Sequence, residues 1–423
     1  MKTGHRRSSP KRITWLLAAL SPLCCGGSHK TASKSPPIPP CHEQGVGVWT
    51  RVASLGQSRF MPAAAVLRDG RVLVSGGQAA RVPFDAPPLN SAEIYVPGRD
   101  AWEPTGSMGE GRVGHQLVAL PDGRVAAFGG GSSSVEVYTP ATGTWAPLAW
   151  APTFRAGAAI LPAPGGRVAV VGGDEVMRPG ALEEYLRPTT MTALLDPARG
   201  TWEDGPAIPV SRDIAIGAAT DNGSLVVFGG HYYRAPWFKW ELFGDRPGPI
   251  SRMTPGIGWW KPGTREWTLV SWPRAYSGKG GAAAPLSSHE VLILAAQGDE
   301  LGNRAAAVFD TATGRWTRTP PMSIERVNAI AVAWRPGCVL VVGGSTPSAP
   351  MELYSSQQRA WQQLPAPPLG AARIAVRLSD EAVLLLGDDD HPQDAYRYTA
   401  VPGSASPHAA RTSSPRSSRS DVR

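Results

Sequence analysis

A short motif that ends in tryptophan recurs along this 423-residue chain, and this recurrence constrains the fold more than any other feature. The tryptophans are Trp49, Trp102, Trp145, Trp202, Trp267, Trp316 and Trp361. In five of the units an arginine precedes the first glycine of a Gly-Gly pair by 17 positions, as Arg59 precedes Gly76. A spacing that stays constant while the intervening residues vary indicates one structural unit repeated.

The unit from Arg112 to Leu148 predicts four antiparallel strands. Apolar or alternating runs at 117–120, 124–128, 135–138 and 144–148 are separated by segments rich in turn-forming residues. Gly129-Gly130 ends the second run, because glycine tolerates unusual backbone angles and close packing without a Cβ. Four such strands in a radial repeat form one propeller blade.

The order of Gly-Gly, tyrosine and tryptophan resembles the kelch repeat family over roughly residues 47 to 400. It is clearest in Glu93-Ile94-Tyr95…Trp102, Glu136-Val137-Tyr138…Trp145 and Glu352-Leu353-Tyr354…Trp361. The resemblance implies an all-β, seven-bladed kelch-type β-propeller. Residues 373–398 offer only three strands, and residues 47–55 offer one strand without partners. We therefore expect this N-terminal strand to be the outer strand of the seventh blade and to close the ring.

The positive charge of the chain is concentrated at its two ends. The formal net charge is +8, but residues 1–34 carry seven Lys or Arg and no Asp or Glu, and residues 401–423 carry four Arg and one Asp. The segment between them therefore nets −2 and lacks the basic footprint of a nucleic-acid-binding domain. We expect a monomeric propeller over 47–400, no nucleic-acid partner, and a disordered basic Ser/Arg tail over 401–423.

Residues 1–25 resemble an export segment. A basic start is followed by an apolar run from Ile13 to Leu23, which is shorter than the about 20 residues that span a bilayer. Cys24-Cys25-Gly26-Gly27 then resembles the lipid-attachment box of bacterial lipoproteins, although Leu23 stands where that family favours a small residue. We expect export to the cell envelope through a lipid on Cys24 or Cys25, the only membrane contact, or else free secretion. Residues 26–46 form a Pro/Ser-rich linker.

The remaining cysteines give no sign of a metal site. Cys41 falls in the linker and Cys338 at the start of a strand. Because the linker is expected to be flexible, we expect no bridge between them, with Cys338 a small buried apolar residue. Asp388-Asp389-Asp390-His391 could hold a hard cation such as calcium, but a solvated acidic turn explains it better. No metal and no other cofactor is predicted.

The repeated arginines have two interpretations. They are Arg59, Arg112, Arg155, Arg212, Arg326 and Arg373. They could bind carboxylate or phosphate groups of a ligand through bidentate hydrogen bonds. Alternatively, each one ties down backbone carbonyls of the neighbouring blade as a repeated part of the scaffold. Recurrence in nearly every blade favours the scaffold role.

The longest insertion, 231–257, breaks the repeat and carries five aromatic residues within positions 231–240. Loops on a rigid scaffold often carry function, and exposed aromatic rings suit a sugar face or a protein hot spot. The alternative is that these rings pack on the propeller itself. We predict non-catalytic binding of a protein or glycan partner on the face that carries this loop. The candidate binding residues are Tyr232, Tyr233, Trp237, Trp240, Arg155 and Arg212.

Two enzyme classes on related propellers are alternatives, and no catalytic residue is assigned for either. A sialic-acid mutarotase-like activity would use the arginines to bind an acidic sugar. A copper radical oxidase resembling galactose oxidase would need a cysteine cross-linked to a tyrosine, with further histidine and tyrosine ligands. The only cysteine within the predicted propeller is Cys338, which is expected to be buried in a strand.

Overall fold

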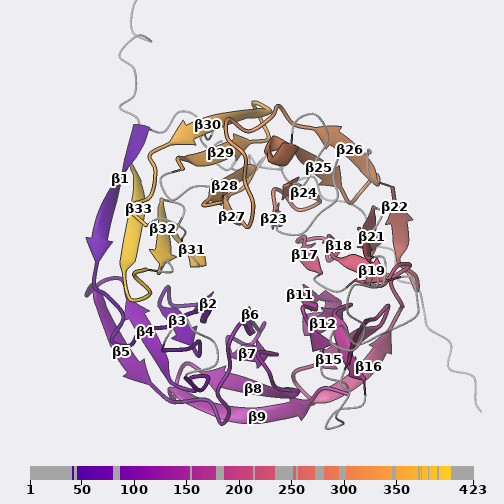
Figure 1. Cartoon of the computed structure of the whole chain (residues 1–423), viewed down its shortest axis with the longest axis horizontal. Coiled ribbons are helices and arrows are strands. Elements are labelled where there is room, and N and C mark those ends of the chain that lie inside the picture. The colour runs from indigo at the N-terminus through magenta and orange to yellow at the C-terminus, as the bar shows by residue number, and fades with distance from the viewer. Residues whose placement is uncertain are drawn as a thin grey trace, which may run out of the picture. The chain divides into compact units, whose positions relative to one another are not determined.

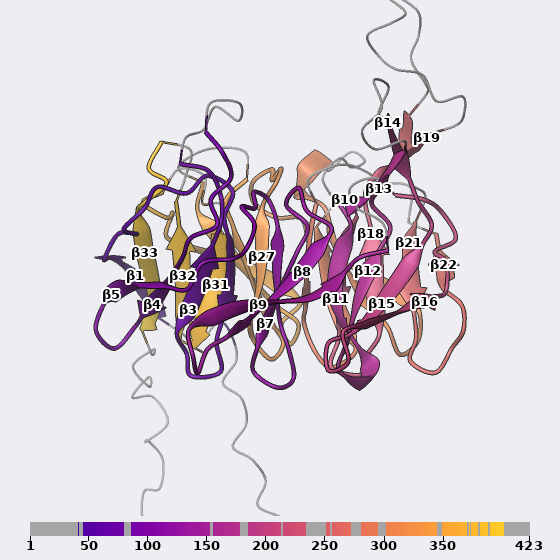
Figure 2. The same cartoon turned by 90° about the horizontal axis from the view of Figure 1, so that it is seen from below.

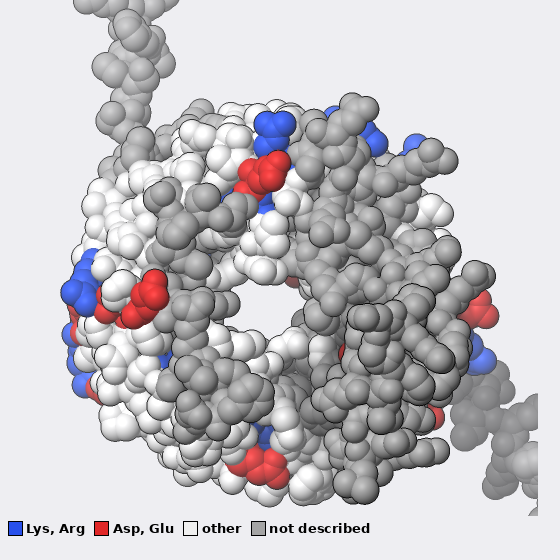
Figure 3. Space-filling view, in the orientation of Figure 1, with Lys and Arg blue, Asp and Glu red and all other residues white. Residues whose placement is uncertain are grey.

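Seven four-stranded antiparallel sheets stand in a ring around a central opening (Figures 1 and 3). The computed structural model describes residues 41, 45–79, 86–152, 155–177, 185–212, 215–233, 251–253, 256–271, 281–294, 302–344, 349–369, 372, 374–379, 381–387 and 390–401. The prediction of an all-β, seven-bladed propeller is confirmed. The helical segments of this described part are single 3-10 turns such as Pro164–Gly166, and none of its helices is long and apolar enough to cross a membrane.

Each blade is given from the inner to the outer strand. Blade 1 consists of β2 (Ala63–Val66), β3 (Val72–Ser75), β4 (Ala92–Val96) and β5 (Ala101–Thr105). Blade 2 consists of β6 (Gln116–Ala119), β7 (Val125–Phe128), β8 (Ser134–Thr139) and β9 (Thr144–Trp150). Blade 3 consists of β11 (Ala159–Ala163), β12 (Arg167–Val171), β15 (Thr192–Asp196) and β16 (Thr201–Gly205). Blade 4 consists of β17 (Ile216–Ala219), β18 (Leu225–Phe228), β21 (Ile257–Trp260) and β22 (Thr268–Val270). Blade 5 consists of β23 (Ala282–Pro285), β24 (Glu290–Leu294), β25 (Ala306–Asp310) and β26 (Arg315–Arg318). Blade 6 consists of β27 (Ile330–Arg335), β28 (Cys338–Val342), β29 (Met351–Ser355) and β30 (Ala360–Leu364). Blade 7 consists of β31 (Ile374–Ser379), β32 (Ala382–Leu386), β33 (Ala395–Val401) and β1 (Gly45–Val52).

The hydrophobic core lies between neighbouring blades. Every residue of the second strands β3, β7 and β18 is buried, because both faces of these strands are covered by an adjacent blade. One cluster, for example, joins Val72 and Val74 of blade 1 to Leu384 and Leu386 of blade 7. The innermost strands are rich in alanine, as in β2 and β23, where small side chains suit the crowding near the axis.

In blades 1, 6 and 7 the repeated tryptophan connects the blade to the one before it. Its ring packs on the tyrosine of its own third strand, with centroids 5.1 Å apart in the Tyr95–Trp102 pair. Its indole N–H reaches the preceding blade: Trp102 donates to Ala53 O at 2.8 Å, and Trp361 donates to Pro320 O at 2.9 Å. The motif thus stabilises the contact between blades as well as the blade itself.

The N-terminal strand closes the ring, as predicted. β1 pairs with β33 as the outer strand of blade 7, with Trp49 opposite Tyr398 in the register. Trp49 donates to Pro365 O of blade 6 at 3.3 Å, as Trp102 and Trp361 donate to their preceding blades. The first and last strands of the propeller are therefore neighbours in one sheet.

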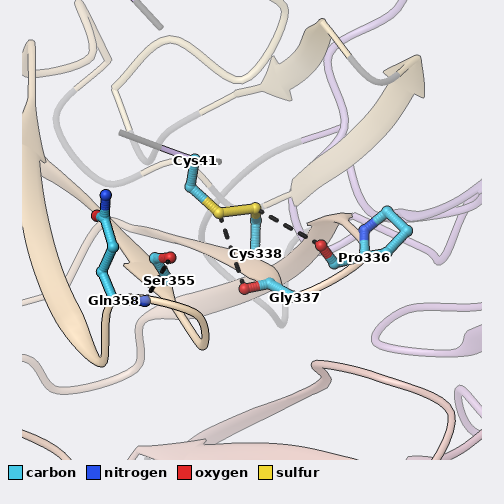
Figure 4. Close-up of a disulfide and its surroundings, with 6 residues drawn as sticks. All are labelled: Cys41, Pro336, Gly337, Cys338, Ser355 and Gln358. Atoms are coloured by element: carbon cyan, nitrogen blue, oxygen red, sulfur yellow. Dashed lines mark hydrogen bonds between the residues drawn. A yellow bond between two sulfur atoms is a disulfide. The ribbon is translucent and has the colours of Figure 1, made fainter. Parts of the chain in front are cut away.

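The prediction that Cys41 and Cys338 stay apart is wrong. The two residues form a disulfide with their Cα atoms 6.2 Å apart (Figure 4). Cys41 is buried in a core cluster with Trp334 and Leu340, so this part of the expected linker is anchored to blade 6. Cys338 is buried in β28 as expected, but as one half of a covalent link across 297 positions of sequence.

Candidate functional site

The two faces of the ring differ in the loops that they carry. We call the loop face the side where the connections from second to third strands, and from each blade to the next, emerge (upper side in Figure 2). The opposite side, the turn face, carries tight turns such as that at Gly70 between β2 and β3. On the loop face, the N–H of Gly77 in blade 1 donates to Arg112 O of blade 2 at 2.7 Å. The two kinds of connection therefore meet on one side, as predicted.

Blades 3 and 4 add two small sheets to the loop face. β10 (Arg155–Ala156), β13 (Asp174–Met177) and β14 (Tyr185–Pro188) form a three-stranded sheet. β19 (His231–Tyr233) and β20 (Ser251–Met253) form a hairpin, and β14 contacts β19. Both rise above the ring in Figure 2. They break the sevenfold repeat at one place on the loop face.

In blades 1, 2 and 6 the repeated arginine is buried and forms an ion pair with a glutamate of its own blade. We call this buried pair the Arg–Glu latch. Arg326, which is 2% exposed, donates to Gly343 O at 2.6 Å and to the carboxylate of the fully buried Glu352 at 2.9 Å. Arg59 pairs in the same way with Glu93, and Arg112 with Glu136. The scaffold interpretation holds for these blades, but the carbonyls that accept belong to the same blade and not to the neighbouring one.

The glutamate partners were not predicted from the sequence, although the sequence contains a signal for them. Glu93, Glu136 and Glu352 each lie two residues before the tyrosine of the repeat. Each also lies opposite the residue that precedes the Gly-Gly pair by two positions, for example Glu93 opposite Val74. A glutamate fixed at this strand position beside a repeated arginine predicts a buried ion pair, since buried charges are normally paired.

Blades 3 and 4 lack this glutamate. Its strand position is taken by Ala193, opposite Val170, and by Gly258, opposite Val227. Arg155 donates to Met191 O at 3.0 Å, and Arg212 donates to Gly229 O and Gly256 O at 2.9 and 3.0 Å. Burial lowers the pKa of Arg212 to about 9. The structure thus places Arg212, 1% exposed, inside its blade, whereas Arg155 lines a pocket.

The other predicted site residues are only partly described. Tyr232 and Tyr233 belong to strand β19, which places their backbone on the loop face. Trp237 and Trp240 lie outside the described residues, as do Cys24, Cys25 and Arg373. Asp388 and Asp389 also fall outside them. The aromatic binding site and the lipid-attachment site therefore remain predictions.

A cavity of about 190 Å³ opens between blades 2 and 3. One wall is the short connection between β7 and β8, which contains Gly129–Gly131 and Ser132–Ser134, and the other includes Arg155, Gly157 and Ala158. Phe128, Ile160 and Val170 add apolar surface, and Trp202 completes the lining. This concave region was not anticipated from the sequence.

His115 joins blades 1 and 2 beneath the loop face. Its ring Nε2 lies 2.9 Å from Ser75 Oγ, and the residue is 5% exposed. Burial lowers the pKa of His115 to about 3, and the charges of Arg112 and Arg59 lower it further in the same direction. The folded state therefore holds this imidazole neutral across the ordinary pH range.

We expect His115 to make the propeller less stable in mild acid. An unfolded histidine takes up a proton near pH 6.5, whereas the folded one resists protonation down to about pH 3, so stability present above pH 6.5 is lost as the pH falls. Between pH 7 and pH 5 this amounts to about 2 kcal/mol. Urea unfolding at both pH values should show this difference shrinking in His115→Gln and persisting in His289→Gln, which alters an exposed histidine. An unchanged pH dependence in His115→Gln would assign the effect to other groups.

The fold is a seven-bladed propeller whose repeat resembles the kelch motif, and comparisons with known proteins find the same motif in part of the chain. The Kelch motif matches residues 59–109. Two galactose oxidases of Gibberella zeae are 40% identical over 76 residues, which is 18% of this chain and 11% of theirs. An F-box/kelch-repeat protein of Arabidopsis thaliana is 41% identical over 56 residues, 13% of this chain and 15% of that protein. These matches support placing the chain among kelch-repeat proteins, and they span only a small part of the relatives' length.

Solved structures share the fold at low sequence identity. A fungal alcohol oxidase of the AA5 family, in complex with copper, superposes with a TM-score of 0.61 and 14% identity, covering 85% of this chain and 77% of that one. The structure of YjhT superposes with a TM-score of 0.50 and 14% identity, covering 74% and 99%. At this identity the likeness concerns the fold alone.

The described residues do not fit a copper radical centre. The cross-linked cysteine of such a centre would have to be Cys338, the cysteine within the propeller, but its sulfur is bonded to Cys41. Within the described part of the chain, no group of three or more His, Cys, Asp or Glu side chains is placed to hold a metal ion. The donor set therefore gives no support to the oxidase alternative.

Proposed function

We propose that this chain is an exported, non-catalytic propeller that recognises a protein or glycan partner on its loop face. The observation that carries the proposal is the pair of added sheets, β10–β13–β14 and β19–β20, on that face of blades 3 and 4. They extend a rigid ring at one place without contributing to the blades themselves. The segment that carries Trp237 and Trp240 follows β19 in the sequence and lies outside the described residues; it is the proposed source of the aromatic contacts.

A strained residue on the same face supports a binding role. The position two residues after the repeated arginine has a positive φ in blades 1, 2, 3 and 6. Gly114 and Gly157 occupy it in blades 2 and 3, but Met61, at φ 52°, occupies it in blade 1. A methionine in this region costs about 1–2 kcal/mol relative to glycine, and Met61 is 44% exposed, so packing does not repay the cost. A flexible apolar side chain kept there suits contact with a partner.

The disulfide supports the proposal of export. Disulfides persist in oxidising compartments and are rare where thiols are kept reduced. The Cys41–Cys338 bond lies at the point where the ring closes, so the propeller would be most stable outside a reducing cytoplasm. Lipid attachment at Cys24 or Cys25 is the proposed form of anchoring.

We expect replacement of Trp237 and Trp240 by alanine to weaken partner binding by at least about tenfold, because aromatic anchors dominate interface energies. The partner would first be captured by cross-linking on the cell surface and by glycan-array binding of the exported protein. The melting temperature should stay within about 2 °C of wild type, since these residues lie outside the blades. Unchanged binding in the double variant would refute the aromatic site, and a large fall in melting temperature would assign the segment to the scaffold.

A further inference from the structure

One exposed position of the loop face carries a tryptophan in blade 2 and a small residue in other blades. A backbone hydrogen bond identifies the position, because in four blades the residue after it donates to the connection before the third strand. In blade 2 this donor is Ala151, which donates to Ser133 O at 2.8 Å, and in blade 1 it is Met108, which donates to Asn90 O at 2.8 Å. The residues that precede the donors are Ser107 in blade 1, Trp150 in blade 2, Ala207 in blade 3 and Pro321 in blade 5, and all four are exposed. The scaffold therefore does not require a large aromatic residue at this position.

A regular strand holds Trp150 at the surface. β9 has seven residues, whereas the outer strands β5 and β16 have five, and its last residue, Trp150, pairs with Ser134. A register shift between Val135 and Glu136 precedes this pair, and such bulges re-aim side chains at sheet edges. Trp150 is 67% exposed, whereas the other tryptophans of the described chain are buried or half-buried. The indole is therefore presented to solvent from a fixed backbone.

A carboxylate lies on the same side of the blade as this indole. Ser134 is the register partner of Trp150, and partners in an antiparallel ladder direct their side chains to the same side of the sheet. The Ser134 hydroxyl donates to Glu110 Oε2 at 3.2 Å. Arg112, which also donates to Ser134, is paired with Glu136, and Glu110 forms no ion pair with any described residue. Glu110 therefore gives this part of the loop face a net negative charge.

The wider loop face has the same sign of charge. Glu325, before blade 6, and Asp390, in the connection between β32 and β33, are exposed on it, whereas the repeated arginines Arg59, Arg112 and Arg326 are buried. Acidic side chains are accordingly visible on the described part of this face, and most of the basic ones lie towards its rim (Figure 3). Complementary charge would attract a basic partner to this face.

We propose that Trp150 and Glu110 bind an arginine side chain of a basic partner protein, which rests on the proposed function in that the loop face receives a partner. The face of a tryptophan is the best aromatic partner for a guanidinium, and a carboxylate accepts charge-assisted hydrogen bonds from the same group. Tryptophan and arginine are also the residues enriched at the energetic centres of protein interfaces. The negative charge beside the indole favours this cationic group over a neutral glycan.

The probe is a tri-arginine peptide, and a tri-citrulline peptide is its neutral isostere. In the full-length protein with ¹⁵N-labelled tryptophan, tri-arginine should shift one of the 15 indole N–H signals, and that signal should be missing in Trp150→Phe. Tri-citrulline should leave the same signal in place. Trp150→Ala and Glu110→Gln should each weaken tri-arginine binding, measured by fluorescence anisotropy of a labelled peptide, by about two- to fivefold, the effect of one exposed cation–π contact or ion pair.

Two variants are matched controls and should bind tri-arginine as the wild type does. Glu381→Gln removes the same charge from an exposed turn of the turn face, and Val48→Ala shortens an exposed apolar residue of β1. The proposal is overturned if no indole signal responds to millimolar tri-arginine, if tri-citrulline shifts the Trp150 signal equally, or if Trp150→Ala binds as tightly as the controls. A Trp150 signal that responds to maltotriose and not to tri-arginine would also overturn it and assign the site to glycans. The Trp237/Trp240 experiment follows the captured partner and not this peptide, so each of the two proposals can fail without the other.

Discussion

Replacing Glu352 with alanine is expected to lower the free energy of unfolding by about 3–5 kcal/mol, because it leaves the Arg326 guanidinium buried without its carboxylate. Glu352 is fully buried and accepts from Arg326 at 2.9 and 3.0 Å. Its other oxygen accepts from the N–H of Ser323 at 2.7 Å, so the substitution also releases the loop before β27. Denaturant unfolding followed by circular dichroism measures the change.

The control is an ion pair on the surface of the same propeller. Arg99 and Glu103 are paired with side chains 65% and 43% exposed, so Glu103→Ala should change stability by less than about 1 kcal/mol. The double variant Arg326→Met with Glu352→Leu should recover much of the loss, because apolar residues can replace a buried pair. If Glu352→Ala lowered the free energy of unfolding no more than Glu103→Ala does, the Arg–Glu latch would contribute nothing to the stability of the blade.

Removing the disulfide should have an effect of similar size. The double variant Cys41→Ser with Cys338→Ser is expected to lose about 2–5 kcal/mol, since the bond closes a loop across 297 positions and holds the segment before β1 against blade 6. A thermal melt of the wild type should show a lower transition temperature after reduction. The double variant should melt at that lower temperature with or without reductant.

Two further observations decide what the disulfide does. Thiol titration of the unreduced, unfolded wild type should show Cys41 and Cys338 unreactive and should recover both after reduction. A melting temperature that does not respond to reductant would show that β1 pairing alone closes the ring. In that case the bond would be a consequence of the proximity of the two residues and not a source of stability.

The fold was predictable because the repeat encodes it several times over. The sequence also predicted how the ring closes. It offers no fourth strand after Tyr398, and the strand around Trp49 has no partners of its own within the first blade. The disulfide was missed because composition placed Cys41 in a flexible linker, whereas the residue stands only four positions before β1 and is held by packing on Trp334. Local composition gives no information on such a long-range contact.

The cavity could not be predicted for a different reason. Its lining includes Ser134 and Val135, where the pairing of β8 with β9 shifts register, and the repeat pattern does not reveal this local irregularity. The Arg–Glu latch, by contrast, was within reach of the sequence. Glu93, Glu136 and Glu352 hold one strand position, and only the pairing rule for buried charges was needed to connect them with the repeated arginines.

Ring closure by β1 also determines how the protein can be presented. Gly45 at the start of β1 pairs with Val401 at the end of β33, and Ala400 donates to Glu381 O in the turn between β31 and β32. Both ends of the propeller therefore lie at the turn face, opposite the added sheets. An affinity tag, a fluorescent protein or a solid support attached at either end of the propeller would lie on the side of the turn face. The proposed recognition surface on the loop face would then be directed outward whichever end is tethered, which makes immobilised display a suitable format for partner screening.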